Sequence, residues 1–111
     1  MPRTAIAIAV VLMGLADAGT ALADVDDVAL AIRNNRFEPA ELHVPAGRKL
    51  RLVVRNLDAT PEEFESYELN REKIVAGAAG AVIYVGPLEP GRYPFFGDFH
   101  QATARGALVA E

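Results

Sequence analysis

Residues 49–56 read Lys-Leu-Arg-Leu-Val-Val-Arg-Asn, a stretch in which apolar side chains alternate with charged ones. Successive side chains of an extended chain point to opposite faces, so Leu50, Leu52 and Val54 share one face. This period of two is typical of a strand that covers a core with one face and meets water with the other. The stretch therefore favours an antiparallel β-sheet protein.

The same alternation recurs along the chain, and turn residues separate the runs. Turn signals stand at Asn34-Asn35, at Pro45-Ala46-Gly47 and at Glu89-Pro90-Gly91. Together with one ambiguous stretch at 61–69, about seven short strands at this spacing predict an all-β sandwich. Besides 49–56, strands are expected at 28–32, 42–44, 81–85, 92–96 and 106–110.

Residues 61–69 carry two conflicting signals. Thr60, Pro61 and Glu63 have the form of a helix start, with an N-cap, a proline in the first turn and a capping-box acid. The residues from Glu63 to Leu69 also alternate in part, which suits a strand. The local sequence leaves both structures open.

Composition excludes several classes of function. The chain has 111 residues, enough for one domain, with a formal net charge of −4 and no cysteine. The negative charge disfavours nucleic-acid binding, which depends on basic side chains that contact phosphates. Without cysteine, the chain forms no disulfide, thiolate zinc site, iron–sulfur cluster or standard blue-copper centre.

The first 23 residues have the form of a secretory signal peptide. Arg3 precedes twelve uncharged residues, 5–16, and small residues then end in Ala21-Leu22-Ala23, an A-x-A cleavage signature. A membrane-spanning helix needs about 20 apolar residues, so this run is too short to span. We expect a signal peptide over 1–23 and one domain over 24–111, exported to the periplasm.

The two histidines differ in their surroundings. His43 alternates with Leu42 and Val44, which predicts a solvated position with no other ligand nearby in sequence. Asp98 and His100 follow a strand end and would project to the same side of an extended chain. A carboxylate and an imidazole so placed are half of a metal site. A histidine that only hydrogen-bonds a loop carbonyl would give the same sequence.

An acidic run could supply the other half of such a site. Glu62-Glu63-Phe64-Glu65 places three carboxylates in four positions, and Glu63 and Glu65 share a side if the chain is extended. Carboxylates this close need a cation, a basic partner or ample water. With His100 they would suit Fe(II), Fe(III), Cu(II) or Mn(II), and zinc is also compatible. A solvated acidic loop is the alternative.

Several segments together resemble the cupredoxins. Phe37-Glu38-Pro39 followed by residues 42–47 resembles the opening of that fold, and 52–58 resembles its third strand with an N-x-D turn. Residues 88–95 resemble the L-x-P-G-x-Y-x-F entry to the penultimate strand, and 106–109 resemble the closing strand. The match covers nearly all of 27–111. It implies a cupredoxin-like Greek-key β-sandwich with a metal-bearing loop before the last strand.

Within this fold the chain resembles EfeO-type cupredoxin-like domains and the small FtrB-like periplasmic cupredoxins of ferrous-iron uptake systems. These carry an E-[FW]-E segment where electron carriers have their first copper histidine, and Glu63-Phe64-Glu65 matches it. The resemblance implies that Glu63, Glu65 and His100 bind metal, with Asp98 a further ligand, and it favours a strand over 62–69. Some EfeO domains have a cysteine in the terminal loop, and this chain does not.

The expected function is therefore a periplasmic copper- or iron-binding protein that holds one or two Cu(II) or Fe(II)/Fe(III) ions. It would support Fe(II) oxidation or deliver iron to a high-affinity permease; the sequence leaves open whether it is an enzyme. A non-catalytic metal chaperone would use the same ligands. A metal-free β-sandwich interaction module would keep Glu63, Glu65 and His100 apart. Oligomeric state is also left open, and a homodimer is compatible with the resemblance.

Overall fold

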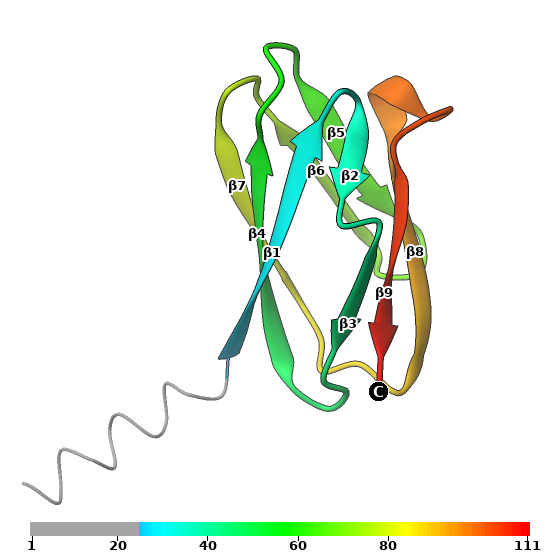
Figure 1. Ribbon diagram of the computed structural model, residues 1–111. Coiled ribbons are helices and arrows are strands. Elements are labelled where there is room, and N and C mark those ends of the chain that lie inside the picture. Colours follow the sequence, from blue (N-terminus) through cyan, green and yellow to red (C-terminus); the bar gives the residue numbers. More distant parts are fainter. Residues whose placement is uncertain (1–24) are drawn as a thin grey trace, which may run out of the picture.

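The computed structural model describes residues 25–111, which form nine strands and one short 3-10 helix (Figure 1). The signal peptide expected over 1–23 lies outside the described residues. No helix in the described part is both long and apolar enough to cross a membrane. The elements are β1 (Val25–Arg33), β2 (Arg36–Glu38), β3 (Glu41–Val44), β4 (Lys49–Asn56), β5 (Glu62–Ser66), β6 (Arg71–Val75), β7 (Gly80–Val85), β8 (Gly91–Gly97), η1 (Asp98–His100) and β9 (Arg105–Ala110).

The strands form two sheets that face each other as a sandwich, which confirms the all-β fold. One sheet has the order β2-β1-β4-β7, and the other has the order β3-β9-β8-β5-β6. The expected number of about seven strands is wrong, because β2 is too short to show a repeating pattern and β6 carries no clear alternation. The first has only three residues, and four of the five residues of β6 are exposed.

Two strand pairs are parallel, where alternation favoured antiparallel pairing throughout. β1 runs parallel to β4, and β3 runs parallel to β9. Alternation reports which face of a strand is buried, but it carries no information about the direction of the neighbouring strand. The remaining pairs are antiparallel.

The core lies between the sheets and follows the pattern of residues 49–56. Leu50, Leu52 and Val54 are buried, and the residues between them are exposed or half-buried. An aromatic cluster joins the two layers: Phe37 packs edge-on against Phe95 at 4.9 Å between ring centroids, and Phe64 stacks on Phe95 at 5.0 Å. These contacts fix β5 and β8 side by side at the centre of the five-stranded sheet.

The ambiguous stretch begins as strand β5 and ends in a turn, so its helix signal is not realised. β5 pairs with β6 on one side and with β8 on the other. Its side chains alternate, with Glu62, Phe64 and Ser66 buried and Glu63 and Glu65 half-buried. Two flanking strands and a buried phenylalanine stabilise the extended chain here more than a capping box stabilises a helix of this length.

Candidate metal centre

Three of the predicted ligands converge on the outer face of the five-stranded sheet. Glu63 and Glu65 point outward from β5, and the pairing of Phe64 with Gly97 carries the next residue, Asp98, to a position beside Glu63. One carboxylate oxygen from each of Glu63, Glu65 and Asp98 lies within 4.8 Å of the others. We call Glu63, Glu65 and Asp98 the acidic cluster; their carboxylate oxygens lie close enough together to bind one cation.

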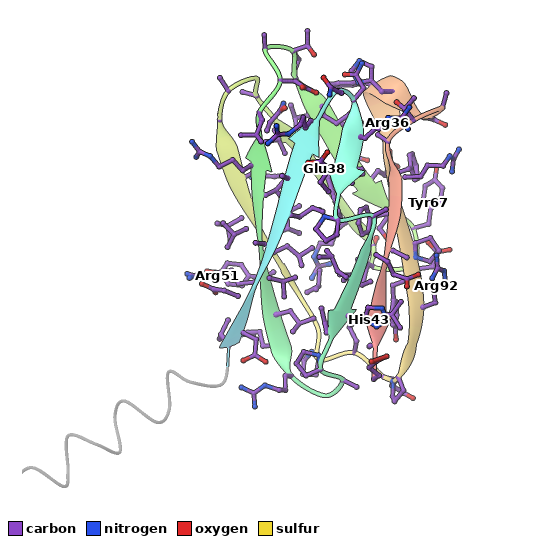
Figure 2. All side chains as sticks on the ribbon, in the orientation of Figure 1. Arg36, Glu38, His43, Arg51, Tyr67 and Arg92 are labelled. Atoms are coloured by element: carbon purple, nitrogen blue, oxygen red, sulfur yellow. The ribbon has the colours of Figure 1, made fainter. Side chains whose placement is uncertain are left out.

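Side chains on this face mark its orientation in the molecule. Figure 2 shows Tyr67 projecting from one side of the sandwich and Arg51 projecting from the opposite side. Tyr67 follows β5 directly, is 75% exposed and lies with its ring centroid 5.5 Å from that of Phe96. Phe96 is in turn the β8 partner of Glu65. An aromatic pair therefore borders the acidic cluster.

The carboxylates of the cluster destabilise one another's charged forms. Partial burial, followed by the nearby charges of Glu72 and Asp98, raises the pKa of Glu63 above its ordinary value. The pKa of Glu65 is raised for the same reasons in the same order. Among residues 25–111, no lysine, arginine or histidine forms an ion pair with Glu63, Glu65 or Asp98. A bound cation would remove this repulsion.

Glu72 is a residue of this site that the sequence did not identify. It lies on β6 directly opposite Glu65, and its charge acts on both Glu63 and Glu65. Because β6 was not expected, nothing placed Glu72 beside the acidic run. The usable signal was the short separation of Glu72 from Glu65 in the sequence, because a tight hairpin after Glu65 would bring the two residues opposite each other.

His100 lies in a different contact from the other predicted ligands. Its Nδ1 is 2.6 Å from Oε2 of Glu62, a carboxylate that is only 1% exposed, and the histidine side chain is 30% exposed. Oε1 of Glu62 accepts hydrogen bonds from the backbone N–H of Phe99 at 2.9 Å and from that of Glu63 at 3.0 Å. The structure therefore brings together three of the four predicted ligands and pairs the fourth with a buried glutamate.

Glu62 also fills the space around Gly97. A Cβ atom at Gly97 would lie 2.5 Å from Cδ of Glu62 and 2.7 Å from Cβ of Ala104, closer than real Cβ contacts. The sequence grouped Glu62 with the exposed acidic run. Alternation could have distinguished Glu62 from the rest of that run, since in a strand it lies on the same face as the buried Phe64. Glu63 and Glu65 lie on the opposite face.

His43 lies on β3 and engages both ring nitrogens with carboxylates. Nδ1 is 3.2 Å from Oε1 of Glu111, and Nε2 is 3.2 Å from Oε1 of Glu41. Glu111, and then Glu41, raise the pKa of His43. The side chain is 56% exposed, which agrees with the solvated strand position expected from the sequence.

Comparison with known proteins identifies the fold. A sequence model of the cupredoxin-like domain matches residues 4–110. An uncharacterized protein of Rickettsia prowazekii (strain Madrid E) is 46% identical over 83 residues. The match covers 75% of this chain and 66% of the relative, so the chain spans just under two thirds of that protein's length.

Two solved structures show the same architecture at low sequence identity. One is the metal-binding domain of the Streptococcus pneumoniae Cu(I)-exporting P-type ATPase CopA with Cu(I), at a TM-score of 0.67 and 15% identity over 79% of this chain and 87% of that one. The other is auracyanin A, a "blue" copper protein from Chloroflexus aurantiacus. Its TM-score is 0.68 and its sequence identity 14%, and the match covers 78% of this chain and 99% of that one. Both likenesses concern the fold.

A blue-copper centre does not fit the residues of this chain. Such a centre requires a cysteine thiolate, and none of the 111 residues is cysteine. The interior beside Gly97 and Ala104 is taken by the Glu62 carboxylate, which already has three hydrogen-bond partners. The chemistry available on this sandwich is that of carboxylate oxygens on an outer face.

Proposed function

The chain belongs to the cupredoxin-like domain family, and from that premise we propose that it binds a hard or borderline metal cation through Glu63, Glu65 and Asp98. One observation carries the proposal: three carboxylates from two separate elements converge within 4.8 Å without an ion-pair partner in the described part of the chain. The half-buried position of each lets an ion reach them from solvent.

Oxygen donors decide which ions suit this site. Carboxylates favour iron and manganese over soft Cu(I), and Cu(II) is also compatible with oxygen ligands. A site rich in anionic oxygen stabilises the more highly charged member of a redox couple. We therefore propose that the cargo is iron, and that binding favours Fe(III) over Fe(II). This supports Fe(II) oxidation with dioxygen as the electron acceptor, or passage of oxidised iron to a permease.

The match of Glu63-Phe64-Glu65 to the E-[FW]-E segment supports the finer assignment to the EfeO-type and FtrB-like group. On this proposal residues 1–23 direct export to the periplasm, and the partner is a component of a high-affinity iron uptake system. The outer-face position of the acidic cluster supports delivery, because a partner protein can reach the ion without opening the core. A non-catalytic metal chaperone is therefore the second candidate.

A metal titration of the purified protein tests the proposal. Fe(II) under anaerobic conditions, Fe(III) as a weak chelate, Cu(II) and Mn(II) are added separately, and calorimetry gives stoichiometry and affinity. Glu65→Gln should weaken binding by about tenfold or more. Glu68→Gln, an exposed glutamate in the following turn, is the matched control and should bind like wild type. Oxygen consumption with Fe(II) then separates oxidation from delivery.

Two outcomes of this titration would refute the proposal. Binding that is absent for every ion would leave the metal-free interaction module. Equal loss in Glu65→Gln and Glu68→Gln would show that the titration reports only general negative charge and not a defined site.

A further inference from the structure

We infer that Glu62 and His100 are positioning residues, which form a clamp that holds Asp98 against Glu63 and Glu65. The inference rests on the proposed function, because it assigns how the cation site is built. Neither residue is counted among the ligands. Both act through the backbone that carries the ligands.

The Glu62 carboxylate connects the two segments that supply the acidic cluster. It points inward from β5, where its own neighbour Glu63 points outward. Oε1 accepts from the backbone N–H of Glu63 at 3.0 Å and from that of Phe99 at 2.9 Å, and Oε2 bonds His100 Nδ1 at 2.6 Å. One buried group thus holds the backbone beside Glu63 and the two residues that follow Asp98.

The short helix η1 depends on such a clamp because it has few contacts of its own. It contains only Asp98, Phe99 and His100, none of them buried, and its N-cap Gly97 provides no side-chain cap. Its other ties lie within the same turn: the Thr103 and Ala104 N–H groups donate to His100 O, the Gly97 N–H donates to Ala104 O, and the Gln101 side-chain amide donates to Asp98 Oδ1 at 2.7 Å. Loss of the Glu62 carboxylate would leave Asp98 on a turn without these hydrogen bonds to β5.

The place of the His100 ring outside the acidic cluster supports positioning over ligation, because the Nδ1 contact with Glu62 alone would leave Nε2 open to a metal. Nδ1 faces Glu62, and among the described residues the group of ligand atoms within 4.8 Å of one another includes Asp98 but not His100. Residues that orient the ligands of a metal site typically change affinity by 10–100-fold when altered. The same range is expected for Glu62 and His100.

Terbium(III) luminescence tests the clamp with a probe suited to carboxylate oxygens. Tyr67 borders the cluster through Phe96, so its excitation should sensitise a bound terbium ion. Tyr67→Phe should abolish the sensitised emission while leaving affinity intact, which locates the ion. Emission lifetimes in H2O and D2O count the water molecules on the ion. All variants are compared at a temperature where circular dichroism shows them folded.

Glu62→Ala should lower terbium affinity 10–100-fold and add a water to the ion, because Asp98 no longer reaches it. Glu62→Gln keeps an oxygen for both backbone N–H groups and should recover part of the affinity. His100→Ala, which keeps Glu62, gives a milder second variant in case Glu62→Ala does not fold. In a Glu62→Ala/Asp98→Asn double variant, the two losses should not add, since both act through Asp98.

Several results would overturn the inference. Additive losses in the double variant would show that Glu62 does not act through Asp98. An unchanged water count in both Glu62→Ala and His100→Ala would show a role in stability alone. Histidine nitrogen coupling in the EPR spectrum of the Cu(II)-loaded protein, lost in His100→Ala, would make His100 a ligand. A wild type that binds no terbium would refute the proposed function itself, and the clamp with it.

Discussion

Adding a single methyl group at Gly97 tests the packing of the buried end of the sandwich. The residue has a φ of −97°, which any amino acid adopts, so Gly97→Ala introduces no backbone strain of its own. The new Cβ would instead lie 2.5 Å from Cδ of Glu62, 2.8 Å from its Oε1 and 2.7 Å from Cβ of Ala104. The Glu62 carboxylate must move, since the Cβ of Ala104 can move only with its backbone. That backbone is held by hydrogen bonds to His100 and Gly97.

The cost follows from what the carboxylate leaves behind. Its displacement weakens two backbone hydrogen bonds to a buried charged group, each worth about 1.5–3 kcal/mol. Overpacking of a filled interior adds about 1–3 kcal/mol. Because the bonds are weakened and not all lost, we expect a decrease of about 3–5 kcal/mol in the free energy of unfolding. For a domain of this size each kcal/mol lowers Tm by about 4–8 °C.

Thermal unfolding followed by circular dichroism measures this effect. Gly97→Ala should melt at least about 12 °C below wild type. Gly80→Ala is the control, since its Cβ would lie 3.1 Å from a single backbone oxygen of Val54 and needs only a small adjustment. A Gly97→Ala protein that melts within about 3 °C of wild type would refute the packing argument.

Four further substitutions test other parts of the structure. The backbone N–H groups of Asn35 and Asn34 lower the pKa of Asp58 below 3.8, so its ionised carboxylate stabilises the folded protein, and this stabilisation is lost as pH falls. The difference in Tm between wild type and Asp58→Asn should therefore narrow below about pH 4. Because the pKa of Glu65 is raised, its charge destabilises the folded protein above about pH 4.5. Glu65→Gln should therefore raise the Tm of the metal-free protein at pH 7 but not at pH 4. Phe64→Ala should cost about 3–5 kcal/mol in urea unfolding. His43→Ala should leave metal affinity unchanged in calorimetry.

Contrary outcomes are equally specific for each substitution. A pH-independent gap for Asp58→Asn would remove its carboxylate from the Asn34–Asn35 turn. A Glu65→Gln gain that persists at pH 4 would come from packing and not from charge. A loss below about 1 kcal/mol for Phe64→Ala would contradict its place in the aromatic cluster. Weaker metal binding by His43→Ala would make that histidine a ligand.

Alternation along the sequence predicted the sandwich because burial on one face is a local property of a strand. The stretch 49–56 shows this: the inward positions 50, 52 and 54 are apolar, and burial alternates to the end of β4, where the inward residue is Asn56. Strand direction and the existence of β6 could not be predicted this way. β6 is an edge strand with exposed Glu72, Lys73 and Ile74, and its place is set by pairing with β5 and not by its own composition.

The candidate site was predictable in part for the same reason. Glu63 and Glu65 share a face by alternation, and the resemblance placed Asp98 in the terminal loop near them. The partner of His100 could not be predicted, because the contact with Glu62 crosses 38 positions and depends on the pairing of Phe64 with Gly97. The role of Glu62 was hidden within an acidic run that otherwise faces solvent.

The position of β9 has a consequence for how the chain acquires its structure. β9 lies between β3 and β8, and Leu42 pairs with Leu108, 66 positions later. Closing such a long loop costs entropy before any contact rewards it, so we expect folding on the slow scale of β-sandwiches, milliseconds to seconds. Until β9 inserts, β3 and β8 both expose open edges that can pair with another chain. Assembly, and not the finished sandwich, is therefore the stage at which this protein is most open to aggregation.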